Sequence, residues 1–333
     1  MKWVACELHT HTIHSDGKQT LEELAEGAAK LGFECIALTD HNTMSGLEDR
    51  ERAERKTGIA IISGMEWTTF YGHMLAIGIS SSADWRLARP DNIAEGAAEV
   101  HRLGGLTGLA HPYRIGSPVC TGCFWEFEIR DWRDFDYIEV WSKTFAPAQA
   151  DNRRAFRLWT DLLNAGVRIA AVSGRDWHEQ AETDEPVSVL YLGIEGEASG
   201  AREIAQAALE ALGAGRASVT IGPLLTLKLR SAAGREYVLG DAVPQGEREF
   251  EALAEVSFSV RRGLWQLDGD SVLLVLTGAG GPLAERRIGL ADCGLSFGFE
   301  MPDSRPAWIR AELWGSVRGA RVMIAFTNAI YFD

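Results

Sequence analysis

The sequence predicts an α/β protein whose residues 1–222 form a β/α barrel or a close variant, followed by a β-rich domain over residues 223–333. Three observations support this. Short apolar runs alternate with helical stretches as far as about residue 222, which is typical of a largely parallel sheet with helical crossovers. Polar residues follow the ends of those runs, the edge at which barrels build their sites. Past residue 222, alternating runs between Gly-rich turns indicate an antiparallel sandwich-like fold.

The first 66 residues contain three predicted strands. Residues 3–8 are apolar and lead into the stretch E-L-H-T-H-T-I-H-S-D at 7–16. If residues 3–8 form a strand, the side chains of His9 and His11 leave the same face of it. A helix is expected over 20–31, where Thr20 and Glu23 form a capping box. Strands are expected at 33–38 and 59–63, before His41 and Glu66, with a helix over 46–57 between them.

The same pattern continues to residue 222. An apolar segment at 73–79 and a strand at 106–110 carry His73 and His111, with a helix over 92–103 between them. Strands are expected at 137–140, 168–172 and 187–192, and helices at 148–164 and 201–212. The strand at 168–172 precedes Asp176-x-His178, which is expected to have the same extended i, i+2 geometry as His9-x-His11. Beyond this region the predicted strands lie at 224–229, 250–260, 271–277, 307–313 and 322–326, and no helix is expected.

Composition limits the classes of function. The 333 residues suit one large domain and a smaller one, or two of similar size. A net charge of −14, from 33 basic and 47 acidic residues, argues against extended nucleic-acid binding. Because no apolar run is long enough to cross a bilayer and His9 falls where a signal-peptide core would lie, we expect a cytoplasmic protein.

The five cysteines are too few and too scattered for a disulfide framework. Cys120 and Cys123 form a lone C-x-x-C with no second pair nearby. We expect two loop or core thiols there, and a structural zinc or redox role is the alternative.

Metal-ligand residue types gather at the predicted strand ends. Six of the eight histidines belong to this set. Its members are His9, His11, Asp16, His41, Glu66, His73, His111, Asp176 and His178. Imidazoles and carboxylates that converge in this way predict a metal site. His101 lies within a predicted helix, where packing is expected, and His14 either faces substrate or caps its loop.

The order H-x-H-x4-D, T-D-H, Glu, A-H-P and D-x-H resembles the PHP (polymerase and histidinol phosphatase) superfamily over about residues 1–222. The stretches G-M-E-W-T-T-x-x-G-H-M-L-A-I-G at 64–78 and T-N-A-I-Y-F at 327–332 resemble the CehA/McbA group of metallohydrolases, whose members also carry a β-rich C-terminal domain. The resemblance implies a distorted (β/α)7 barrel with two or three metal ions.

The resemblance also implies how the ligands divide among the ions. The first ion would be held by His9, His11, Glu66 and Asp176, the second by Glu66, His73 and His111, and the third by Asp16, His41 and His178. Every one of these positions holds a residue able to bind a metal. This intact set favours an enzyme.

Nitrogen and oxygen ligands without thiolate suit Zn, Mn or Fe. Three divalent ions against three carboxylates leave a charge of about +3, which would attract an anionic group. We therefore expect a phosphoesterase acting on a small phosphorylated substrate, with a metal-bound hydroxide held by Glu66 and Asp176 as the attacking group. The alternatives are a carbamate, ester or amide hydrolase with the same site, and a metal-stabilised binding or regulatory module without turnover.

Four further residues are candidates for substrate contact. Arg114 follows His111-Pro-Tyr, Arg175 precedes Asp176, Lys143 follows a strand end, and His14 lies in the first loop. Arginine suits bidentate contact with phosphate, and a surface salt bridge is its other reading. The C-terminal domain has three readings: an interaction surface, including a homo-oligomer interface; a lid on the barrel; and a stabilising appendage.

Overall fold

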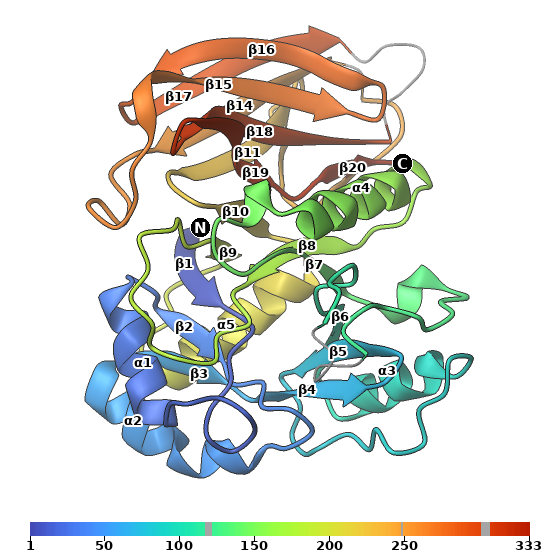
Figure 1. The fold of residues 1–333 in the computed structure, drawn as a ribbon. Coiled ribbons are helices and arrows are strands. Elements are labelled where there is room, and N and C mark those ends of the chain that lie inside the picture. The colour runs from blue at the N-terminus through green and yellow to red at the C-terminus, as the bar shows by residue number, and fades with distance from the viewer. Residues whose placement is uncertain (117–121, 248, 301–306) are drawn as a thin grey trace.

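The structure is a computed structural model that describes residues 1–116, 122–247, 249–300 and 307–333 (Figure 1). Strands and helices alternate over much of its N-terminal part, as the sequence predicts. The strands there are β1 (Lys2–Glu7), β2 (Cys35–Ala37), β3 (Ala60–Ile62), β4 (Gly64–Thr69), β5 (Gly72–Ile77), β6 (Leu106–Leu109), β7 (Tyr137–Ser142), β8 (Ala170–Gly174), β9 (Val189–Ile194) and β10 (Ala217–Thr220). The α-helices are α1 (Leu21–Lys30), α2 (Arg50–Thr57), α3 (Ile93–Arg102), α4 (Ala150–Asn164) and α5 (Ala201–Gly213), and short 3₁₀ helices span Ser45–Asp49, Trp132–Asp134 and Ala146–Ala148. The exceptions to the alternation are that β3, β4 and β5 follow one another, and β9 follows β8, without a helix between them.

The helix α1 illustrates how local sequence determines an element. Thr20 accepts a hydrogen bond from the backbone N–H of Glu23, and the Glu23 carboxylate accepts one from the backbone N–H of Thr20. The predicted capping box is thus confirmed. Leu21, Leu24, Ala25 and Ala28 form the buried face of the helix.

The strands of this part belong to two sheets of mixed direction. The first carries β1, β2 and β3 in parallel, with β9 antiparallel to β1 and β10 antiparallel to β9. The second has the order β4-β5-β6-β7-β8, in which β4–β5 and β5–β6 are antiparallel and the remaining pairs are parallel. The prediction of a largely parallel sheet is therefore wrong for β4–β6 and β9–β10. A tight turn at 70–72, with Gly72 at a φ of 141°, folds β4 back onto β5 without a helical crossover.

Two isolated β-bridges connect these sheets. Thr10 pairs with Trp177, and His41 pairs with Glu66, both in parallel. No continuous ladder between the described residues of β3 and β4, or of β8 and β1, closes the ring. The two bridges lie just where the ligand-type residues gather.

The C-terminal part is built of strands, and within its described residues no helix follows α5. Its strands are β11 (Leu224–Ser231), β12 (Glu236–Val238), β13 (Ala242–Val243), β14 (Glu249–Ser257), β15 (Asp268–Gly278), β16 (Gly281–Gly289), β17 (Cys293–Glu300), β18 (Trp308–Val317), β19 (Ala320–Thr327) and β20 (Ile330–Phe332). The five predicted strands correspond to β11, β14, β15, β18 and β19. Four strands form a separate sheet in the order β12-β11-β14-β17.

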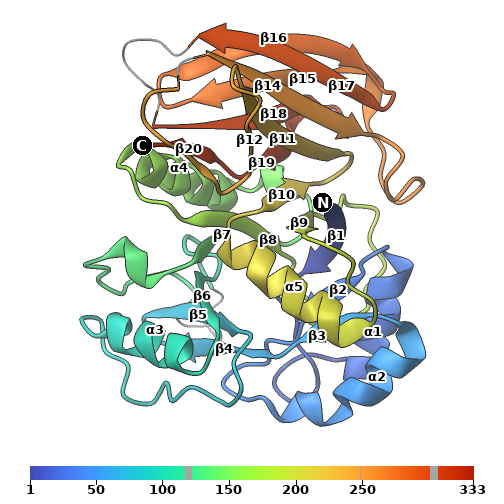
Figure 2. The same cartoon turned by 180° about the vertical axis from the view of Figure 1, so that it is seen from behind.

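The remaining C-terminal strands continue the first sheet. β10 pairs with β9 on one side and with β19 on the other, so the sheet passes through the predicted boundary at residue 222 (Figures 1 and 2). The division into domains at 1–222 and 223–333 stays a prediction.

The side chain of Asn328 ties the C-terminal strands to β8. Its Oδ1 accepts a hydrogen bond from the backbone N–H of Ala171 at 2.8 Å, and its Nδ2 donates to the Ala171 carbonyl, also at 2.8 Å. Asn328 is 1% exposed. It thus occupies the place that a neighbouring strand would take along β8. Nearby, Phe326 packs edge to face against Trp141 and Phe156, which extends the apolar core across this boundary.

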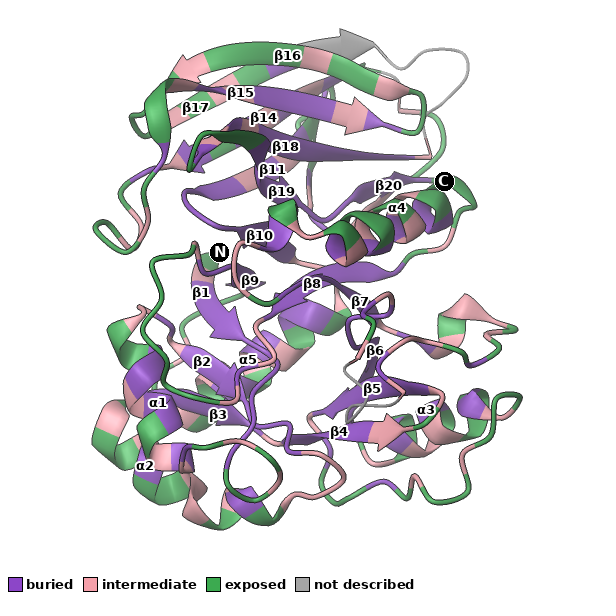
Figure 3. Cartoon of the chain, viewed as in Figure 1, coloured by how far each residue is buried: buried purple, intermediate pink, exposed green. Residues whose placement is uncertain are grey.

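Most of the buried residues lie in the strands of the sheets (Figure 3). The strands β1 to β10 are almost wholly buried, whereas β16 is largely exposed. Among the described residues, no helix is both long and apolar enough to cross a membrane.

Candidate metal centre

His9 and His11 lie just beyond β1, which ends at Glu7 and not at Leu8 as predicted. The segment stays extended because its backbone bonds to Trp177: the Trp177 N–H donates to the His9 carbonyl, and the His11 N–H donates to the Trp177 carbonyl. Glu7 accepts hydrogen bonds from the backbone N–H groups of His9 and Arg175, both at 2.9 Å. The segments 7–11 and 175–177 are therefore joined through hydrogen bonds to their main chains.

Glu66 lies inside β4, and His73 lies near the start of β5, so the expectation that both follow strand ends is wrong. Their positions come from the hairpin, in which Thr68 pairs with His73 and Glu66 with Leu75. The side chains of Glu66 and His73 meet on one face, with His73 Nδ1 3.0 Å from Glu66 Oε1. The alternation of M-E-W-T-T is the sequence signal for this strand.

Two of the ligand-type residues have backbone conformations that non-glycine residues seldom adopt. His111 has a φ of 27° and Asp176 a φ of 54°. Such conformations cost about 1–3 kcal/mol each and persist where surrounding contacts impose them. Because of its left-handed conformation, Asp176 does not continue β8. The extended D-x-H geometry assumed from the sequence is therefore wrong, although both side chains reach the cluster.

The nine predicted ligands converge in three overlapping groups. Within each group, the potential ligand atoms lie within 4.8 Å of one another. The groups are His9, His11, Glu66 and Asp176; His41, Glu66 and His73; and His11, Asp16, His41 and His178. His111 joins through Nε2, which lies 3.3 Å from Glu66 Oε1.

Glu66 lies at the centre of the cluster. Its Oε1 is 3.3 Å from His9 Nε2 and 3.0 Å from His73 Nδ1. Its Oε2 is 2.8 Å from His41 Nδ1 and 3.5 Å from His11 Nε2. One carboxylate thus faces both of the deeper groups, as a bridging ligand would.

Exposure rises across the cluster. The side chains of His9, His11 and Glu66 are fully buried, whereas that of Asp16 is 61% exposed. His41 and His178, which face Asp16 at 3.3 and 3.1 Å, have intermediate exposure. The group that contains Asp16 therefore lies at the mouth of the site.

Several buried atoms of the cluster have no hydrogen-bond partner among the described residues. They are His9 Nε2, both ring nitrogens of His11, Glu66 Oε2, His73 Nε2 and His111 Nδ1. Leaving a buried polar atom unpaired costs about 1–3 kcal/mol, and polar atoms in native proteins are seldom left so. Buried nitrogens without partners beside buried carboxylates fit divalent metal ions, and the N/O set without thiolate suits Zn, Mn or Fe.

Burial and neighbouring charges have opposite effects on the pKa values of the acidic and imidazole side chains in the cluster. Burial alone would raise the pKa of Glu66 and of Asp176, but the neighbouring imidazoles, together with Arg114 beside Asp176, hold both pKa values well below their usual range. Burial would lower the pKa of His41, yet Glu66 and Asp16 raise it to about 10. Burial dominates at His11 and lowers its pKa to about 4. The carboxylates are thus ionised, as metal ligands must be.

Three polar side chains hold the ligands from outside. Thr68 Oγ1 lies 2.6 Å from His41 Nδ1, and Glu139 Oε2 lies 2.7 Å from His9 Nδ1. Asp40 accepts hydrogen bonds from the backbone N–H and hydroxyl of Thr12, each at 2.7 Å, which fixes the loop that carries Asp16. The sequence reasoning did not single out these residues. A lone Glu within the apolar run Y-I-E-V-W was the available signal for Glu139.

The four predicted substrate contacts are placed very differently. Arg114 is 6% exposed, and its guanidinium donates to Asp176 Oδ2 at 2.5 Å and to Ser142 Oγ at 2.6 Å. His14 Nδ1 lies 2.8 Å from Ser45 Oγ. Lys143 is exposed at the end of β7. None of these placements tests a contact with substrate.

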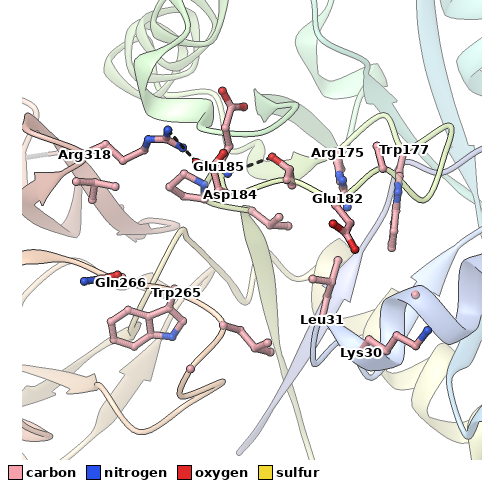
Figure 4. Close-up of a pocket in the computed structure, with 18 of the residues that line it drawn as sticks. Lys30, Leu31, Arg175, Trp177, Glu182, Asp184, Glu185, Trp265, Gln266 and Arg318 are labelled. Atoms are coloured by element: carbon pink, nitrogen blue, oxygen red, sulfur yellow. Dashed lines mark hydrogen bonds and ion pairs between the residues drawn. The ribbon is translucent and has the colours of Figure 1, made fainter.

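Arg175 and Trp177 face a separate cleft, of about 1500 Å³, which the loop at 180–187 forms with residues 263–268, 317 and 318 of the C-terminal part (Figure 4). The Arg175 guanidinium stacks 4.4 Å above the Trp177 ring. Successive side chains of the segment 175–178 therefore point in opposite directions. Asp176 and His178 face the cluster, while Arg175 and Trp177 line the cleft. Cys120 lies outside the described residues, so the C-x-x-C prediction cannot be examined.

Fold and site together define an α/β protein with a multinuclear metal-binding cluster of His, Asp and Glu. A comparison with protein families agrees, because the model of the PHP domain matches residues 7–111. Residues 7–111 of the chain thus belong to a PHP domain. Its likeness to the CehA/McbA group stays a prediction.

Two of the known proteins that resemble the chain are a phosphodiesterase and a phosphatase. It is 31% identical over 176 residues to the phosphoribosyl 1,2-cyclic phosphate 1,2-diphosphodiesterase of Eggerthella lenta, covering 40% of this chain and 66% of that relative. It is 32% identical over 122 residues to the 3',5'-nucleoside bisphosphate phosphatase of Chromobacterium violaceum, covering 35% of this chain and 40% of that relative.

Among solved structures, a two-domain protein from Bacteroides vulgatus, described as containing a PHP-like metal-dependent phosphoesterase, matches with a TM-score of 0.52 at 14% identity. The match covers 99% of this chain and 95% of that one. At this identity the similarity concerns the fold alone.

Proposed function

We propose that this protein is a metal-dependent phosphoesterase that acts on a small phosphorylated substrate at a di- or trinuclear centre. The observation that supports this most strongly is the set of buried, unpaired ligand atoms around Glu66. The two relatives named above, whose names specify phosphorylated ribose compounds, support the substrate class.

The proposed roles of the residues follow from burial and distance. His9, His11, Glu66 and Asp176 would hold the first ion, and Glu66 would bridge to a second beside His73 and His111. Asp16, His41 and His178 would hold a third at the mouth of the site, with the His11 ring also within reach. Ions bound there would lower the pKa of coordinated water and neutralise the oxygens of a phosphoryl group.

Protein groups would bind and orient the substrate. Because exposure rises toward Asp16, the phosphate would enter from that side. Lys143 and His14, which lie at the ends of β7 and of the first loop, would contact it or the group it is attached to. Arg114 would act indirectly, since its guanidinium is occupied by Asp176 and Ser142.

We further infer that residues 1–222 form a distorted (β/α)7 barrel. At two places the barrel would be closed only by single bridges, Thr10–Trp177 and His41–Glu66, and not by continuous ladders. The segments at these two places carry the ligand-type residues. A C-terminal sandwich, covered on one side by the sheet β12-β11-β14-β17, would complete the architecture.

The test is an assay of purified protein loaded in turn with Mn²⁺, Zn²⁺ or Fe²⁺. Hydrolysis of p-nitrophenyl phosphate or bis-p-nitrophenyl phosphate is expected, and Glu66→Gln should abolish it. Hydrolysis of p-nitrophenyl esters without any phosphoesterase activity would favour the alternative carbon-centred reaction. An absence of bound metal in elemental analysis of the loaded protein would refute the proposal.

A further inference from the structure

Glu139 is a buried acid to which the proposed reaction assigns no role. It lies in β7 at 0% exposure, between Ile138 and Val140, which belong to the apolar core. Its Oε2 is 2.7 Å from His9 Nδ1, and His9 is its only ion-pair partner among the described residues. Removing a carboxylate from water costs several kcal/mol, so net stability of the fold is a poor explanation for its presence.

The contact with Glu139 determines which nitrogen of His9 faces the cluster. When Nδ1–H donates to Glu139, the lone pair of Nε2 is left to point inward. Nε2 lies 3.3 Å from both Glu66 Oε1 and Asp176 Oδ1 and has no hydrogen-bond partner. The imidazole is therefore held as a ligand through Nε2.

Other imidazoles of the cluster have weaker outer partners. His178 Nδ1 lies 2.9 Å from the backbone carbonyl of Asp176, and His41 Nδ1 lies 2.6 Å from the hydroxyl of Thr68. Among the described residues, only His9 has a carboxylate outside the cluster on its second nitrogen. A carboxylate at that position fixes the ring and makes the ligating nitrogen more basic.

The backbone of β8 leaves space for this pair. A Cβ atom at Gly174 would lie 2.6 Å from His9 Cβ and 2.8 Å from Glu139 Oε2. Neither contact is tolerable without movement of the pair. The hydrogen bond between His9 and Glu139 is thus fixed by three separate segments: β7, β8 and the residues just beyond β1.

From this arrangement we propose that Glu139 is a positioning residue that directs His9 Nε2 at the first metal and makes the group of His9, His11, Glu66 and Asp176 the tightest of the metal sites. This inference rests on the metal binding of the proposed function. It does not depend on which bond is hydrolysed.

The test is calorimetric titration of chelator-treated protein with Mn²⁺ or Zn²⁺, with Glu139→Ala and Glu139→Gln beside the wild type. Glu139→Ala should weaken the tightest binding step about 10- to 100-fold, the usual cost of losing an outer partner of a metal ligand. Glu139→Gln, which still accepts the hydrogen bond but lacks the charge, should fall between the two. The absorption spectrum of the Co²⁺ form should change in the Ala variant.

Thr68→Val is the matched control, since it removes the outer partner of His41 with little change of volume. It should leave the tightest step unaltered and weaken a later one. If the tightest step is the same in wild type and both Glu139 variants, the proposal is wrong. Because binding is measured directly, metal binding with no turnover would contradict the proposed function while leaving this inference standing. If Glu139→Ala does not fold, Glu139→Gln decides the question.

Discussion

Replacing Asn328 by alanine tests whether the C-terminal strands are part of the fold that carries the metal cluster. The side chain makes two hydrogen bonds of 2.8 Å to the backbone of Ala171 and a weaker one, at 3.3 Å, to the Ala217 carbonyl. Because Asn328 is 1% exposed, water could not replace these hydrogen bonds. Asn328→Ala would leave the N–H and carbonyl of Ala171 without these partners.

The expected cost follows from those two groups. Each buried polar group left unpaired costs about 1–3 kcal/mol, so the free energy of unfolding should fall by about 2–6 kcal/mol. Urea unfolding followed by tryptophan fluorescence and by far-UV circular dichroism measures the change. Both signals should report one transition at a lower midpoint with an unchanged slope, because β8 and the C-terminal strands unfold together.

Asn92→Ala is the control for Asn328→Ala, because the same chemical change there removes hydrogen bonds at the surface. It should cost only about 0.5 kcal/mol. A loss below about 1 kcal/mol for Asn328→Ala would refute the reasoning about Ala171. Two separate transitions in the wild type would show that the C-terminal part is an independent appendage.

Four other outcomes are expected. Chelation of bound metal should lower the melting temperature, because an ion at 100 times its dissociation constant stabilises the fold by about 2.7 kcal/mol; equal melting with and without chelator would contradict this. His9→Ala should reduce kcat/KM at least about 10³-fold with an unchanged circular dichroism spectrum, and wild-type turnover would exclude the first metal site. Lys143→Met should raise KM for a phosphate ester several-fold at constant metal affinity, whereas an unaltered KM would remove Lys143 from the substrate site. The hydrogen bond to Asp136 raises the pKa of His101, so the stabilisation from this pair is present below the ordinary pKa of about 6.5 and disappears as the pH rises through the raised pKa. His101→Gln should therefore remove this pH dependence from the midpoints of unfolding measured at a series of pH values. Parallel curves for wild type and variant would contradict the prediction.

Residue types and their spacing were sufficient to pick out nine ligand-type residues that the structure brings together. All nine residues picked from the sequence lie in one cluster, because each follows or lies within a short buried strand and buried strands of one fold must share a core. The PHP resemblance rested on the same motifs and agrees with the family match over 7–111. Their division among ions is still a proposal.

The local sequence pattern of each segment did not predict whether neighbouring strands pair in parallel or antiparallel. The hairpin of β4 and β5 follows β3 after a single residue, so the apolar run at 59–63 hid the start of a second strand. The antiparallel pairing of β9 with β1 and of β10 with β19 depends on contacts between residues far apart in the chain. No local periodicity encodes them.

The sequence by itself determined which ligand-type side chains to expect near one another and where many of the strands and helices lie, because both depend on chemical type and short-range spacing. Only the tertiary structure decided the outer partners of those ligands. Glu139, Thr68 and Arg114 act through contacts between separate strands and loops, and burial gives each contact its strength. The same holds for Asn328, whose effect on β8 arises 157 residues away in the chain.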